Sequence, residues 1–191
     1  MEFVQTRASY VGQTSLYGYL KARMGTRYRV MFEDDVFSAS IRDAAVKVFI
    51  ACLADLTIFT VAVAAAGGRL RADEAQALAR HCFQTALDRG LTEVDPDQIP
   101  ADAVADFEAR TVATAWSNAA QGPDTFQASG RGLIRHAPVV DEFKELDQEI
   151  VQNSIRFRWR DIREQARKRF DGAAIAAAWR DRAGAPAATN P

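Results

Sequence analysis

Residues 48–66 of this 191-residue chain read VFIACLADLTIFTVAVAAA, and this stretch decides the fold. Asp55 is the single charge in it, so a helix drawn through the stretch is apolar on every side. The preceding residues, 35–47, are apolar on one helical face only, and the glycine pair at 67–68 supplies a left-handed helix stop. The sequence therefore predicts one long helix over 35–66 that is amphipathic first and wholly apolar later.

A helix that is apolar all round fits either the centre of a helical bundle or a membrane span. Its 19 residues at 48–66 would cover about 28 Å at about 1.5 Å per residue. Nine Val, Ile, Leu and Phe side chains favour insertion by about 4 kcal/mol, whereas one central Asp opposes it by about 3 kcal/mol. Because this balance is close, we expect the bundle core and keep the membrane span as the alternative.

Helical spacing continues outward from this stretch, and no run alternates as a β-strand would. Residues 3–24 form one helix or, because of Gly12 and Gly18, two shorter ones. Further helices are expected at 73–89, 101–120, 138–170 and 172–182. The predicted fold class is all-α, a compact bundle of five or six helices with a long apolar central helix and a long basic C-terminal helix. Residues 1–182 would form a single helical domain, followed by a disordered tail at 183–191.

Composition indicates an ordinary globular domain, with 48% hydrophobic residues and a net charge of −1. This charge excludes a uniformly basic nucleic-acid binder, so nucleic acid is not an expected partner. Cys52 and Cys82 lack the spacing of a disulfide scaffold, and residues 1–7 lack the basic start of a signal peptide. We expect a cytoplasmic protein, with inner-membrane association as the alternative, and the excess of Arg over Lys favours a bacterial genome.

The motifs of common hydrolases, nucleotide-binding proteins and zinc enzymes are missing from the sequence. Its two histidines, His81 and His136, are too few for a metal site without other ligands, so we expect no metal and no cofactor. Residues 121–137 are rich in Gly and Pro and predict an exposed loop, in which Arg131 would contact a partner. Ser129 and His136 leave open a small hydrolase without a standard motif.

Asp55 is the one charge that the pattern places in the core. A buried carboxylate must be paired, protonated or functional. We expect a structural ion pair with an Arg from another helix, ahead of a role in binding a ligand or moving a proton.

The predicted helix 138–170 is acidic in its first half and carries seven basic residues against two acidic ones in its second half. Four arginines at positions i, i+4, i+7 and i+11 lie within about 60° of one another and form an arginine stripe: Arg156, Arg160, Arg163 and Arg167. An apolar row beside the stripe would let the arginine stems flank buried surface while their guanidinium groups reach an anion. The stripe is either a solvated rim of the helix, a contact with an acidic protein, or a contact with anionic lipid or nucleic acid.

These features together predict a non-enzymatic adaptor or assembly protein that binds another protein through the arginine stripe and Arg131. The alternative is a membrane-attached protein with residues 48–66 in the bilayer and the basic helix on anionic lipid. A hydrolase using Ser129 and His136 is the third hypothesis.

Overall fold

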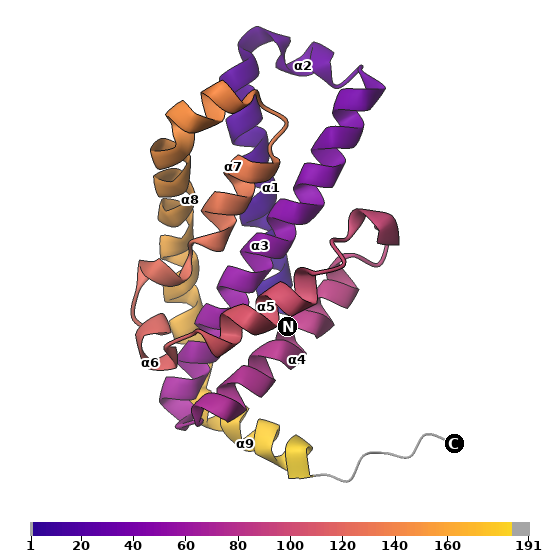
Figure 1. The fold of residues 1–191 in the computed structure, drawn as a ribbon. Helices are drawn as coiled ribbons and strands as arrows, with labels where there is room; N and C mark the ends of the chain where they lie inside the picture. Colours follow the sequence, from indigo (N-terminus) through magenta and orange to yellow (C-terminus); the bar gives the residue numbers. More distant parts are fainter. Residues whose placement is uncertain (1, 185–191) are drawn as a thin grey trace, which may run out of the picture.

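The computed structural model describes residues 2–184, and these residues form helices and turns without a strand (Figure 1). This confirms the all-α prediction. The longer helices are α1 (Glu2–Met24), α3 (Asp35–Gly68), α4 (Ala72–Gly90) and α8 (Asp141–Arg169). The shorter ones are α2 (Tyr28–Met31), α5 (Ala103–Val112), α6 (Trp116–Ala119), α7 (Ala128–His136) and α9 (Gly172–Gly184), with 3₁₀ turns η1 (Gly25–Arg27), η2 (Pro96–Gln98) and η3 (Pro123–Thr125). Of the tail expected at 183–191, residues 185–191 lie outside the described residues.

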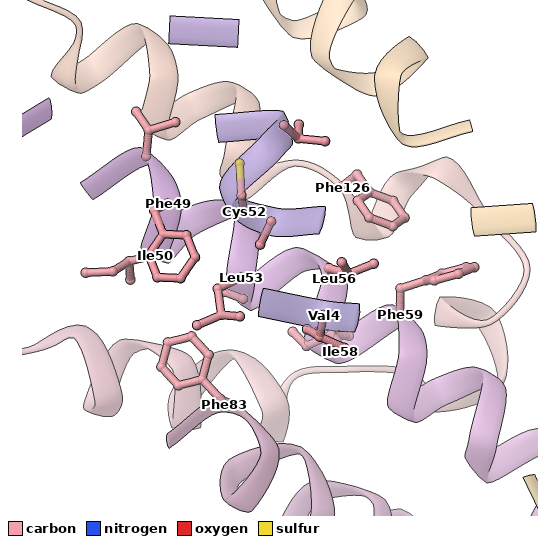
Figure 2. Packing of buried hydrophobic residues seen from close by; sticks show 14 of the residues in the cluster. Val4, Phe49, Ile50, Cys52, Leu53, Leu56, Ile58, Phe59, Phe83 and Phe126 are labelled. Carbon is pink, nitrogen blue, oxygen red and sulfur yellow. The ribbon is translucent and has the colours of Figure 1, made fainter. Parts of the chain in front are cut away.

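Helix α3 is the centre of the molecule, and α1, α4, α7 and α9 all pack on it (Figure 1). Its N-cap is Asp34, whose carboxylate accepts hydrogen bonds from the Val36 and Phe37 amides, each at 2.9 Å. Helix α3 is long and apolar enough to cross a membrane, yet 89% of its most apolar 18-residue window is buried inside the protein. Its large side chains, among them Phe49 and Phe59, meet Phe83 and Phe126 from neighbouring segments in one core (Figure 2).

The sequence suggested that the glycine pair at 67–68 supplies the left-handed residue that stops α3, and this expectation is wrong. Both glycines are helical, and the left-handed residue is Arg69, with φ 52°. The pair instead allows a close approach of α9, because a Cβ on Gly68 would lie 2.2 Å from the Gly172 carbonyl oxygen. Glycine is therefore selected here by a helix crossing rather than by a turn.

Helix α1 is continuous, so of the two expectations for residues 3–24 the single helix is confirmed and the pair of shorter helices is not. Gly12 is buried on the α3 side, where its Cβ position lies 3.6 Å from the Phe49 backbone. The packing of α1 on α3 offsets the weak helix propensity of glycine.

The expected loop at 121–137 is also wrong in its second half, which is helix α7. Gly130 packs against Gln152 and Ile155 of α8, and Gly132 packs against Ala51 of α3. The predicted helix at 101–120 is interrupted after α5 in a run rich in β-branched residues and resumes only as the short α6. The chain therefore forms more helical segments than the five or six expected.

Candidate functional site

Helix α8 is apolar on its inner side, as the sequence predicted. Val151, Ile155, Trp159, Ile162 and Ala166 are buried there against the rest of the bundle. Over its whole length α8 carries eight basic and seven acidic residues, so it is basic only in its second half.

A second apolar row lies on the outer side of α8 and was missed in the sequence. Phe143, Leu146, Ile150 and Phe157 are exposed, with 72% of Leu146 and Ile150 accessible to solvent. Their spacing of i, i+3, i+7 and i+14 is the heptad spacing of a helix that packs against another helix. We call these four residues the α8 outer row; their sevenfold repeat was the signal available in the sequence.

The arginine stripe continues toward the N-terminus of α8 as a line of glutamates. Glu142, Glu145 and Glu149 lie fourteen, eleven and seven residues before Arg156, which places them in the same band of about 60°. We call the resulting line the α8 charge row: Glu142, Glu145, Glu149, Arg156, Arg160, Arg163 and Arg167. One half of the row is acidic and the other half is basic, and the row runs beside the α8 outer row.

Two of the four stripe arginines already serve the fold. The Arg167 guanidinium donates to the backbone oxygens of Ala120 at 3.0 Å and Gln121 at 3.3 Å, and it lies over the Phe59 ring. Arg163 lies over the Phe126 ring, and burial, followed by the nearby Arg167, lowers its pKa.

Of the other two stripe arginines, Arg160 is exposed and Arg156 is half-buried. Arg160 lies over the Phe157 ring at 4.8 Å, with Asp161 at 3.4 Å. Arg156 has no ion pair among the described residues. The part of the stripe open to a partner is therefore Arg156 and Arg160.

Asp147 lies where α8 packs on α1, and no pattern in the sequence indicated that this charge is buried. Its carboxylate accepts a hydrogen bond from the Tyr19 hydroxyl at 2.9 Å and from the Arg23 guanidinium. Burial raises the pKa of Tyr19, and Arg23 opposes this change. These contacts fix the inner side of α8 and leave its outer side facing solvent.

Asp55 is fully buried and ties three helices together. Its carboxylate accepts from the Arg110 guanidinium at 2.5 Å and from the backbone amides of Ala128 at 3.3 Å and Ser129 at 2.8 Å. These amides belong to the first turn of α7, where a negative charge is favourable. Burial raises the pKa of Asp55, while Arg110 and the hydrogen bonds from Ser129 lower it. This arrangement is the interhelical ion pair that the sequence suggested.

Ser129 and His136, the residues of the hydrolase hypothesis, are in different surroundings. Ser129 is fully buried, and its hydroxyl accepts a hydrogen bond from the Trp159 indole nitrogen at 3.1 Å. His136 lies two turns further along α7 and lines a groove that Ser129 does not reach. The structure does not bring the two side chains together.

That groove, of about 880 Å³, lies along α3 between α5 and α7. Arg131 lines it and donates to the Gln127 side chain at 2.9 Å, so it does not extend the arginine stripe. Within residues 2–184, no group of three or more His, Cys, Asp or Glu side chains could hold a metal ion. No protein family, curated protein or solved structure matches the chain.

Proposed function

We propose that this chain is a non-enzymatic helical assembly protein that binds another helical surface through α8, and that this surface is α8 of a second copy. The observation that carries the proposal is the α8 outer row, whose large apolar side chains are exposed in heptad spacing beside the α8 charge row. Isolated apolar residues on a surface are common, but a continuous row of them along a helix is typical of an interface.

The two copies would pack antiparallel around a two-fold axis beside residues 151–152. In this register Leu146 lies opposite Phe157 of the second copy, and Ile150 lies opposite Asn153. Each contact occurs twice because a two-fold interface uses the same patch on both chains.

Charge selects the antiparallel orientation. The same register brings Glu149 and Glu142 to within two residues of the positions opposite Arg156 and Arg163 of the second copy, an axial offset of about 3 Å that these long side chains can span. A parallel pair would instead place the acidic half of one α8 beside the acidic half of the other, and the basic half beside the basic half. Each exposed pair contributes only about 0.2–1 kcal/mol, so the apolar row supplies the main attraction and the charges choose the orientation.

The test is the mass of the full chain measured by sedimentation equilibrium. We expect a dimer that Ile150→Ser weakens by about tenfold or more, because it removes a large apolar side chain from the centre of the interface. Val112→Ser is the matched control, since Val112 is also an exposed apolar residue, 71% accessible, on α5. A monomeric wild type, or equal weakening by both substitutions, would show that α8 does not join two copies.

Charge reversal tests the register separately. Glu149→Arg places arginine against Arg156 of the second copy and should weaken the dimer. Adding Arg156→Glu to the same chain recreates both pairs with their signs exchanged and should restore it. Failure of the second change to restore the dimer contradicts the antiparallel register.

The membrane-attached alternative places residues 48–66 in a bilayer. The burial of this segment among α1, α4, α7 and α9 supports the bundle instead, because a lipid-facing helix leaves apolar side chains uncovered. Fractionation of the expressed protein distinguishes the two. Recovery in carbonate-washed membranes would overturn the proposal, whereas recovery as a detergent-free, monodisperse species supports it.

A further inference from the structure

The groove between α5 and α7 has the size and lining of a small-molecule site. It is about 880 Å³ in volume and follows α3 from Lys47 to Ile58. The α3 and α5 side chains that form its apolar surface are Ile50, Ala51, Ala54, Ile58 and Phe107. Ligand sites of about 300–1,000 Å³ are mostly apolar and hold a few polar groups that orient the ligand.

Three residues of the Asp55 network line the groove: Arg110, Thr125 and Ala128. Arg110 reaches from α5 to the Asp55 carboxylate and to the Thr125 backbone oxygen, while Asp55 holds the first turn of α7. A second nitrogen of the Arg110 guanidinium, Nη1, is buried and has no hydrogen-bond partner among residues 2–184. A buried donor without an acceptor is costly, and an acceptor oxygen of a ligand would satisfy it.

The two helices beside the groove carry opposite charges. Helix α7 presents Arg131 and Arg135, while Asp102, which directly precedes α5, and Asp106 of α5 also line the groove. All four side chains belong to exposed residues, and no salt bridge joins these two pairs within the described part of the chain. Both sets of charges are therefore free to meet a ligand.

We infer that the groove binds a short zwitterionic compound with an apolar body, of which an apolar dipeptide is the simplest example. The carboxylate of the dipeptide meets Arg131 and Arg135, and its ammonium group meets Asp102 and Asp106. Its apolar side chains lie along α3, and its central carbonyl oxygen accepts from Arg110. A ligand with only one charge leaves one of the two charged pairs without a partner.

Calorimetric titration of the full chain with three related probes tests this inference. The probes are leucyl-phenylalanine, its N-acetyl form without the ammonium group, and its amide without the carboxylate. We expect the free dipeptide to bind one per chain and both blocked forms to bind about tenfold more weakly or worse, since each loses charge-assisted hydrogen bonds. Equal binding of the three probes, or no binding of the free dipeptide, overturns the inference.

Two pairs of substitutions assign each charge to its helix. With Arg131→Gln and Arg135→Gln, the free dipeptide and its amide should bind equally. With Asp102→Asn and Asp106→Asn, the free dipeptide and its acetyl form should bind equally. All four residues are exposed, so the fold does not depend on their charges. If either pair of substitutions leaves the preference for the free dipeptide over the blocked form unchanged, the assignment of that ligand charge to those residues is wrong.

A final pair of variants locates binding in the groove itself. Ala113 is exposed and lines the groove, so Ala113→Trp should fill it and abolish binding without disturbing the core. Arg29→Gln, on the exposed side of α2 outside the groove lining, is the control and should bind as the wild type does. Retained binding with Ala113→Trp overturns the site. None of these changes touches the α8 outer row, so this test and the dimer test fail independently.

Discussion

At the scale of single residues, the two buried aspartates show what the sequence can and cannot reveal. Asp55 stands alone in an apolar run, so its burial and its need for a partner follow from the pattern. Asp147 lies among other charged residues of α8, and only the packing of α1 distinguishes it from them. The sequence around each aspartate does not identify its arginine partner. Arg110 lies 55 residues from Asp55, and Arg23 lies 124 residues from Asp147.

Asp55→Ala, which removes every acceptor of this side chain, should destabilise the protein by about 3–5 kcal/mol at neutral pH. The change removes the carboxylate and leaves the Arg110 charge partly buried without its counter-ion. Urea unfolding followed by circular dichroism measures the loss, with the exposed Asp106→Asn on α5 as a control that should change stability by less than about 0.5 kcal/mol. Equal stability of the two variants would mean that the ion pair contributes nothing.

The same residue predicts a dependence on pH. The pKa of Asp55 is raised above its usual 3.8, so the folded chain holds this proton more tightly than the unfolded chain does. The stability that protonated Asp55 contributes is fully present below the usual pKa of 3.8 and is lost as the pH rises through the raised pKa of the folded chain. Unfolding measured across this window should show a decline for the wild type that Asp55→Asn lacks, and a parallel decline in both proteins would contradict the assignment.

At the scale of helices, the positions of the periodic helical segments could be predicted from the sequence, whereas the structural roles of the glycines could not. Apolar spacing located the predicted helix 138–170 close to α8, and the long apolar run located α3. Glycine has two uses that look alike in a sequence, a turn and a close approach of two helices. Gly12, Gly68 and Gly130 all serve the second use, which depends on a neighbour far along the chain. Residues 128–136, which form α7, are predicted as a loop for the same reason: the sequence does not show that their glycines lie at helix contacts.

Gly68→Ala should destabilise the protein by about 1–3 kcal/mol, because the added methyl group meets backbone atoms of α9 that cannot move aside cheaply. Gly122→Ala is the matched control, since its Cβ position has only the Asp124 amide nitrogen at 3.7 Å. Hydrogen exchange should show faster exchange in α9 for Gly68→Ala alone. If α9 exchanges at the wild-type rate in that variant, the close approach at Gly172 is not what selects glycine.

At the scale of the whole molecule, α8 is the helix with apolar residues on two sides. Its inner side completes the bundle around α3, and its outer side has no cover within the described residues. The sequence predicted the arginine stripe but could not separate Arg163 and Arg167, which serve the fold, from Arg156 and Arg160, which do not. This separation depends on where α6 and η3 lie, and no local pattern encodes that position.

Disulfide trapping tests the orientation of the proposed pair directly. In the antiparallel register, residue 146 lies opposite residue 157 of the second copy, whereas the two copies of residue 146 are about 16 Å apart along the helix axis. A mixture of a Leu146→Cys chain and a Phe157→Cys chain should therefore form disulfide-linked dimers, and neither chain alone should do so. The natural cysteines leave a low background, because Cys52 is buried and burial raises the pKa of Cys82 to about 11. Linkage of the Leu146→Cys chain to itself would instead indicate a parallel pair, in which the acidic halves of α8 lie together and the charge row opposes assembly.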